Sequence, residues 1–121
     1  MTDKPAILVV DSNRANLELL SQELGRGGYT TLSAASLEEL DQVIKGKGRF
    51  ALSLIDPSGF DERIWERCEE LREAKIPFIV ISPQRSPTIQ RDSLKYGASG
   101  LLLKPLAIKD LLEHIRTMIG D

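Results

Sequence analysis

Short aliphatic runs alternate with longer stretches of mixed polarity along the whole chain. The run from Ala6 to Val10 is continuous, aliphatic and followed by polar residues, a pattern typical of a buried strand. Comparable runs predict strands over residues 6–10, 29–33, 50–55, 78–81 and 101–103. Continuous runs of this kind indicate strands that are covered on both faces of a parallel sheet.

Between these runs, apolar residues recur every three or four positions, as on one face of an amphipathic helix. The predicted inward sets are Leu17, Leu20 and Leu24; Leu37, Leu40, Val43 and Ile44; Ile64, Cys68 and Leu71; Ile89 and Leu94; and Leu111, Leu112, Ile115, Met118 and Ile119. Ser36 followed by Glu39 forms a capping box, and Ser86 followed by Pro87 predicts another helix start. The pair in the fourth helix makes the thinnest apolar face of the five.

Five predicted strands and five predicted helices therefore alternate strictly. This order predicts one α/β domain over residues 1–121, with a five-stranded parallel sheet doubly wound as (βα)5 and helices on both faces. A chain of 121 residues is long enough for one hydrophobic core and too short for two. Ligands of such sheets bind beyond the carboxyl ends of the strands, so the residues at those ends are the first candidates for a site.

Composition and charge exclude some classes of function but do not identify one. A hydrophobic share of 41% and a charged share of 28% are ordinary for a globular domain. The net charge of −2 gives no reason to expect direct nucleic-acid binding, and no apolar run is long enough to cross a membrane. Because Cys68 is the one cysteine of the sequence, an internal disulfide is excluded. The lack of a disulfide and the lack of a signal-peptide pattern at the N-terminus together favour a cytoplasmic location. We expect Cys68 to pack inward and the lone His114 to be solvated.

Four polar residues with complementary chemistry follow the predicted strands: Asp11, Asp56, Ser82 and Lys104. Parallel strands place their carboxyl ends on one rim, so these side chains should converge. A carboxylate oxygen can attack phosphorus, while a lysine and a hydroxyl can bind the phosphoryl oxygens. Two carboxylates without histidine or cysteine favour Mg²⁺ over zinc.

The chain resembles the receiver domains of bacterial two-component signalling, of which the chemotaxis regulator is typical. The similarity is carried by Ile7-Leu-Val-Val-Asp11, Leu54-Ile-Asp56, Val80-Ile-Ser82, Gly97-Ala-Ser-Gly100 and Lys104-Pro105. It covers the whole chain and implies a flavodoxin-like fold, with Asp56 as phosphoacceptor, Asp11 as an acid of the magnesium site, Ser82 as the hydroxyl and Lys104 as the lysine. In the family the bond before the equivalent of Pro105 is commonly cis.

Four departures from the family pattern mark a divergent member. Ser12 stands where receivers usually carry a second acid that ligates the metal, which implies weak Mg²⁺ binding. The loop over residues 57–61 lacks the usual Met-Pro, although the Ser58 backbone carbonyl should still be available to the metal. Pro83 has no N–H to give to a phosphoryl oxygen. Leu101 replaces the usual aromatic switch residue.

The resemblance implies a signalling domain, not an enzyme, that receives a phosphoryl group from a histidine kinase or phosphotransfer protein. An output domain or downstream protein would read the change, with possible homodimer contacts through the face formed by residues 86–119. One alternative is a phosphorylation-independent pseudo-receiver that acts through protein contacts.

Two further alternatives rest on the strand-end residues. A phosphatase of the haloacid-dehalogenase type would use Asp11 as nucleophile, but Asn13 stands where its general acid is expected. A nucleotide-binding module lacks support because no glycine-rich turn follows the first strand.

Overall fold

A computed structural model describes residues 6–46, 49–83 and 85–120 of the chain. Across these residues strands and helices alternate strictly, as predicted. The elements are β1 (Ala6–Val10), α1 (Arg14–Arg26), β2 (Thr30–Ala34), α2 (Leu37–Lys45), β3 (Leu52–Ile55), α3 (Arg63–Glu73), β4 (Phe78–Ser82), α4 (Pro87–Lys95), β5 (Gly100–Leu103) and α5 (Ile108–Ile119). The predicted domain bounds of 1 and 121 lie outside the described residues.

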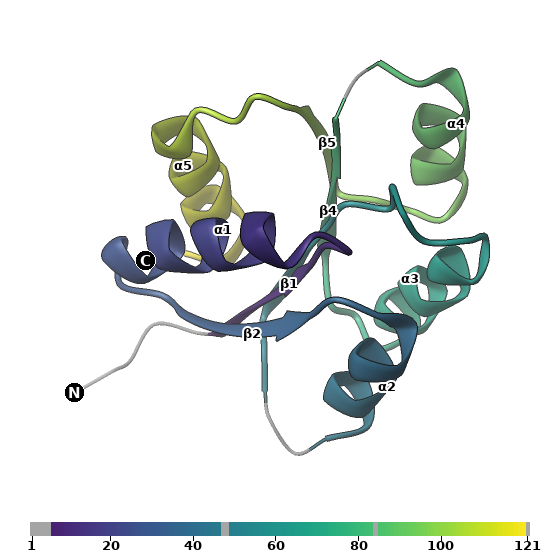
Figure 1. The fold of residues 1–121 in the computed structure, drawn as a ribbon, viewed down its shortest axis with the longest axis horizontal. Helices are drawn as coiled ribbons and strands as arrows, with labels where there is room; N and C mark the ends of the chain where they lie inside the picture. Colours follow the sequence, from purple (N-terminus) through teal and green to yellow (C-terminus); the bar gives the residue numbers. More distant parts are fainter. Residues whose placement is uncertain (1–5, 47–48, 84, 121) are drawn as a thin grey trace.

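The five strands form one parallel sheet in the order β2-β1-β3-β4-β5. Helices α1 and α5 cover one face, and α2, α3 and α4 cover the other, so the molecule has three layers (Figure 1). The chain leaves β1 toward β2 and then crosses back to β3, which makes the β1–β3 boundary a topological switch point. This is the doubly wound, flavodoxin-like fold that the alternation predicted.

The core has two halves, one on each face of the sheet. Successive strand residues point to opposite faces: Ile7 and Val9 pack with α1 and α5, whereas Leu8 and Val10 pack with α2 and α3. All four are no more than 1% exposed. The continuous aliphatic run over residues 6–10 predicted a strand covered on both faces. The structure confirms this, because helices cover both faces of β1.

The helix starts follow their capping residues. The Ser36 hydroxyl accepts a hydrogen bond from the Glu39 N–H at 3.1 Å, and Ser86 caps α4 in the same way through the Ile89 N–H at 3.2 Å. The Glu39 carboxylate accepts from the Ala35 N–H at 2.8 Å, one residue before the cap position of an ideal capping box. These contacts fix where α2 and α4 begin.

Three predictions about the elements need correction. Strand β2 begins at Thr30, because the Tyr29 N–H bonds to the Leu24 carbonyl at 3.1 Å and so closes the end of α1. Strand β3 begins at Leu52, two residues later than predicted. Leu94 does not join the inward face of α4: it is 75% exposed, and Ser93 is buried in its place.

Other predictions are confirmed. Cys68 is buried, His114 is exposed, and the Lys104–Pro105 bond is cis. Among the residues that the structure describes, no helix combines the length and the apolar character needed to cross a membrane.

Candidate functional site

Three of the four predicted site residues meet at the carboxyl edge of the sheet. Asp11 follows β1, Asp56 follows β3, and Lys104 follows β5. Backbone hydrogen bonds tie these positions to the neighbouring strands. The Asp56 N–H bonds to the Val10 carbonyl at 2.9 Å, and the Lys104 N–H bonds to the Ser82 carbonyl, also at 2.9 Å. The sheet therefore fixes where these side chains start.

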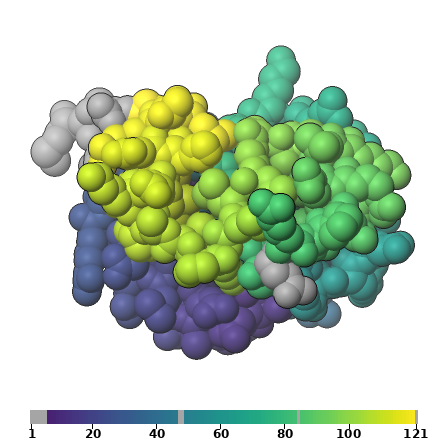
Figure 2. Space-filling model, turned by 90° about the horizontal axis from the view of Figure 1, so that it is seen from above, coloured from purple at the N-terminus to yellow at the C-terminus, as the bar shows by residue number. Residues whose placement is uncertain are grey.

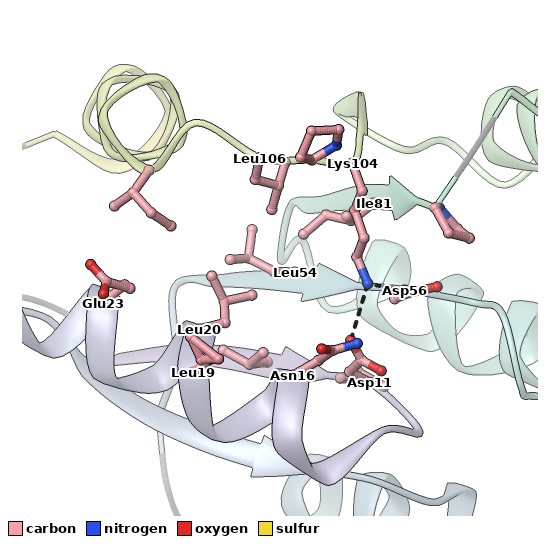
Figure 3. Close-up of a pocket in the computed structure, with 15 residues that line it drawn as sticks. Asp11, Asn16, Leu19, Leu20, Glu23, Leu54, Asp56, Ile81, Lys104 and Leu106 are labelled. Atoms are coloured by element: carbon pink, nitrogen blue, oxygen red, sulfur yellow. Dashed lines mark hydrogen bonds and ion pairs between the residues drawn. The ribbon is translucent and has the colours of Figure 1, made fainter.

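The Lys104 ammonium lies between the two carboxylates. Its Nζ is 2.7 Å from Oδ2 of Asp56 and 3.5 Å from Oδ2 of Asp11 (Figure 3). Burial alone would lower the pKa of Lys104, but the hydrogen bond and charge of Asp56, joined by Asp11, outweigh it and raise the pKa above its usual value. The lysine thus stays charged and partly neutralises two carboxylates, which are only 7% and 4% exposed.

The second oxygen of each carboxylate is held by the adjoining loop. Asp11 Oδ1 accepts from the Asn13 N–H at 2.9 Å. Asp56 Oδ1 accepts from the Ser58 N–H at 2.9 Å and also from the Ser58 hydroxyl. Both oxygens of Asp56 are therefore hydrogen-bonded by the chain itself.

A further hydrogen bond links the two loops. The Ser12 hydroxyl donates to the Ser58 backbone carbonyl at 3.1 Å. Gly59, with φ at +85°, lies directly beside it, and a Cβ on Gly59 would overlap the Ser12 hydroxyl. The absence of a side chain at Gly59 is what lets the loops after β1 and β3 approach this closely.

Ser82 is buried at the end of β4, but it lines a different cavity. That cavity measures about 310 Å³ and is shared with Ser86, Ile89 and Leu101. Its two chain neighbours, Ile81 in β4 and Pro83 just after it, line the cavity that contains Asp56.

The cavity around Asp56 extends away from the acids along α1. It has a volume of about 630 Å³ and is open to solvent along the groove between α1 and the segment after β5 (Figure 3). Its apolar walls are Leu19, Leu20, Leu54, Ile81, Leu106 and Ile108. This groove could not be predicted from the sequence, because Leu19 is 60% exposed and falls outside the periodic core pattern.

The contact of the Ser58 hydroxyl is a second feature that the sequence pattern did not predict. Serine two positions after aspartate is a common turn arrangement, in which the aspartate accepts the backbone N–H of the later residue. The run Asp56-Pro57-Ser58 carries that signal. It would have predicted the backbone hydrogen bond but not the additional hydroxyl contact.

A magnesium site is compatible with the donors present. Asp11, Asp56 and the Ser58 carbonyl supply hard oxygen ligands, the kind that Mg²⁺ prefers. No cluster of three or more aspartate, glutamate, histidine or cysteine side chains that could hold a metal occurs in the described part of the chain. The residues fit Mg²⁺ in chemical type, with one acid fewer than the receiver pattern has.

This fold and these strand-end residues define an α/β domain whose site lies at the switch point of its sheet. The family model described as "Response regulator receiver domain" matches residues 7–116. The chain therefore belongs to the receiver domains of two-component response regulators. Such domains are generally signalling modules that bind Mg²⁺ at the phosphorylation site and interact with histidine kinases and output domains.

Individual relatives agree with this assignment. The response regulator MprA of Mycobacterium avium is 30% identical over 119 residues, which cover 93% of this chain and 50% of the relative. A CheY-like receiver domain protein from Methanospirillum hungatei is 29% identical, with a TM-score of 0.83 and coverage of 95% and 93%. A receiver protein from Pseudomonas putida is 27% identical, with a TM-score of 0.84 and coverage of 97% and 99%. The chain spans about half the length of the curated relatives it matches.

Proposed function

We propose that this receiver domain accepts a phosphoryl group on Asp56 in a two-component or phosphorelay pathway, through a weakened metal and phosphoryl site. The observation that carries the proposal is the Lys104–Asp56 ion pair of 2.7 Å, with Asp11 beside it, at the carboxyl edge of the sheet. A buried carboxylate at the end of a central strand, with a fixed ammonium next to it, suits nucleophilic attack on phosphorus.

In the proposed step an Asp56 oxygen attacks the phosphorus of a phosphohistidine or an acyl phosphate. A new O–P bond forms, the bond from phosphorus to the leaving group breaks, and the leaving group keeps the electron pair. Lys104 would then bind an oxygen of the transferred group and balance its negative charge. The groove along α1 ends at Asp56 and offers the donor a way in.

A bound Mg²⁺ would supply electrostatic screening between the incoming phosphoryl group and the carboxylates. Asp11, Asp56 and the Ser58 backbone carbonyl are the residues that would hold it. Binding should be weak, because Ser12 takes the place of a charged ligand. Pro83 removes a backbone donor near the phosphoryl position.

Intact-mass spectrometry after incubation with acetyl phosphate and Mg²⁺ tests the proposal. We expect a gain of one phosphoryl group at most, and none in Asp56→Asn. Asp92→Asn, a half-buried aspartate of α4 that does not line the cavity around Asp56, is a matched control that should keep the parent behaviour. An undiminished gain in Asp56→Asn would exclude Asp56 as the acceptor.

The main alternative is a pseudo-receiver that works by protein contacts without phosphorylation. It is supported by Ser12 and Pro83, and by the hydrogen bonds that already occupy both Asp56 oxygens. Complete absence of a mass gain in the parent would favour it. A phosphoryl adduct mapped to Asp11 would instead favour the phosphatase alternative.

The proposed partners are a histidine kinase or phosphotransfer protein and an output domain or downstream protein. The face over residues 86–119, built by α4, β5 and α5, is the proposed contact and homodimer surface. Leu94 and Leu103 are exposed in this segment, Figure 2 shows α4 in green and α5 in yellow on the same face of the molecule, and Figure 1 shows β5 between them. A net charge of −2 supports no direct nucleic-acid role. We further propose a cytoplasmic location and no enzymatic role beyond accepting the phosphoryl group.

A further inference from the structure

We infer that the hydroxyls of Ser58 and Ser12 act as an internal latch that occupies the oxygens a divalent cation would need. The inference rests on the proposed function, because it concerns the metal side of the same site. It makes Ser58 a positioning residue that sets metal affinity through its side chain, in addition to its backbone carbonyl. Both hydroxyls belong to loop residues rather than to the sheet.

The first part of the latch is on Asp56. Lys104 holds Oδ2, and the Ser58 hydroxyl and N–H both donate to Oδ1. A cation that binds Oδ1 must displace at least the hydroxyl, because a carboxylate oxygen has few lone-pair positions and one is already used by the backbone. Hydrogen bonds to a charged acceptor are about twice as strong as neutral ones, so this displacement opposes metal binding.

The second part of the latch is on the Ser58 carbonyl. The Ser12 hydroxyl donates to this oxygen at 3.1 Å, from the position where other receivers carry a metal-ligating acid. A serine at that position therefore does two things: it removes a negative charge, and it places a hydrogen-bond donor on a neighbouring ligand. Gly59 makes the contact possible by leaving room for the hydroxyl.

The two hydroxyls form a chain from Ser12 through Ser58 to Asp56, with every donor satisfied by an acceptor of the site. Both loops are thereby held together without a cation between the carboxylates. Removing a hydroxyl takes away a competitor for the metal, whereas removing an acid takes away a ligand. The latch thus predicts opposite effects on metal affinity for serine and aspartate substitutions at one site.

The test is a titration of the parent and its variants with Mn²⁺ alone, followed by electron paramagnetic resonance of the free ion. Mn²⁺ takes the same hard oxygen ligands as Mg²⁺. Ser58→Ala should bind Mn²⁺ roughly tenfold more tightly, as expected for loss of one competing hydrogen bond to a charged acceptor. Ser12→Ala, which frees only a neutral carbonyl, should gain about threefold. The double variant should bind more tightly than either.

Three variants serve as controls. Ser58→Thr keeps a hydroxyl and should stay within about twofold of the parent. Ser33→Ala, at an exposed position of β2, should leave Mn²⁺ affinity unchanged. In the Asp56→Asn background, Ser58→Ala should give no gain, because the charged acceptor is gone. Thermal melting of each variant verifies that the fold is intact.

Ser58→Ala binding Mn²⁺ no more tightly than the parent would overturn the inference, as would an equal gain in Ser33→Ala. The outcome is separate from that of the proposed function. Tighter Mn²⁺ binding without any phosphoryl gain on Asp56 would support the latch and contradict phosphorylation. A phosphoryl gain on Asp56 with unchanged Mn²⁺ affinity in Ser58→Ala would support phosphorylation of Asp56 and contradict the latch.

Discussion

Lys104 and Asp56 lie 48 positions apart in the chain and form an ion pair of 2.7 Å across the end of β4. The pair joins the ends of β3 and β5, which are not neighbours in the sheet. Asp11 stands 3.5 Å from the same ammonium, so one cation serves two nearly buried acids. The stability of this edge of the sheet therefore depends on Lys104.

Lys104→Met should destabilise the protein at neutral pH, because it leaves two buried carboxylates without their cation. Breaking a buried pair costs several kcal/mol, and since the Lys104 side chain is 28% exposed we expect about 1–3 kcal/mol. Urea unfolding measures the loss. Adding Asp56→Asn to Lys104→Met should recover most of it; a double variant as unstable as the single would contradict the electrostatic explanation.

The Lys104 pKa also gives a prediction at high pH. A raised folded-state pKa means that the pairing stabilises the protein fully below the unfolded value of 10.5, and that this contribution is lost as pH rises through the folded value. The stability difference between the parent and Lys104→Met should therefore narrow above about pH 10.5. Urea unfolding of both proteins at pH 8 and pH 11, reported as a difference, separates this effect from general alkaline unfolding.

Much of the fold, and the meeting of three site residues at one rim of the sheet, could be predicted from the sequence. The strand runs are continuous because both sheet faces are covered, so Asp11, Asp56 and Lys104 could be placed on one rim by counting strands. Element ends were less predictable, since Tyr29 looks like a strand residue but closes α1 through its N–H. The periodic pattern also predicted the wrong inward residue on α4, because Leu94 is exposed and the neighbouring Ser93 is buried.

The rest of the site depends on side-chain rotamers and loop approach, which no spacing rule encodes. The Ser12–Ser58 contact exists because Gly59 has a positive φ and no Cβ. The apolar groove exists because Leu19 and Leu106, far apart in sequence, face the same opening beside Lys104. The sequence pattern indicates which functional groups lie at a strand end. It does not indicate which of their donors and acceptors are already hydrogen-bonded within the protein.

Cys68 should resist thiol reagents while the protein is folded. Burial raises the pKa of its thiol to about 12, and the side chain is fully enclosed between α3 and the sheet. Reaction with a disulfide reagent at pH 8 should be slow in native buffer and rapid in denaturant. Fast native labelling would mean that α3 opens frequently, since the thiolate is otherwise inaccessible.

The Arg67–Asp41 pair between α3 and α2 should contribute to stability in a pH-dependent way. Two hydrogen bonds of 3.0 and 2.9 Å from the guanidinium, and its charge, lower the pKa of Asp41 below its usual 3.8. The contribution is therefore present above about pH 3.8 and lost as pH falls through the folded value. A double-mutant cycle with Arg67→Met and Asp41→Asn should give a coupling of about 0.5–1 kcal/mol at pH 7. A coupling that persists at pH 2 would contradict the assignment.

Helix α4 should show the fastest hydrogen exchange of the five helices. Its buried side chain is Ser93, whereas α3 buries Ile64, Trp65, Cys68 and Leu71. Its other anchors are the partly buried Ile89, which packs against the core, and the stack of Tyr96 on Trp65, with ring centroids 5.7 Å apart. A weakly held helix on the proposed contact face would be able to shift on binding a partner. Protection of α4 equal to that of α3, measured by mass spectrometry, would remove the basis for this mobility.

The last prediction concerns repair of the site. Ser12→Asp restores a negative metal ligand and at the same time removes the hydroxyl from the Ser58 carbonyl. Pro83→Ala restores a backbone N–H at the end of β4, and a hydrogen bond to a charged acceptor contributes about 1.5–3 kcal/mol. Each change should therefore increase the affinity for beryllofluoride in Mg²⁺ by roughly tenfold. In the parent, millimolar Mg²⁺ should leave the melting temperature almost unchanged, because stabilisation follows occupancy.

The two changes act on one phosphoryl–metal assembly, so their effects on beryllofluoride affinity should be coupled rather than additive. Ser12→Asp should also lower metal-free stability, because a third carboxylate is added near Asp11 and Asp56 with only Lys104 to offset them. Mg²⁺ should then raise the melting temperature of this variant by several degrees more than that of the parent. A double variant that binds beryllofluoride no better than the parent would place the defect in the loop over residues 57–61. The pseudo-receiver alternative would then become the stronger one, because restoring both lost groups would have left the acceptor inactive.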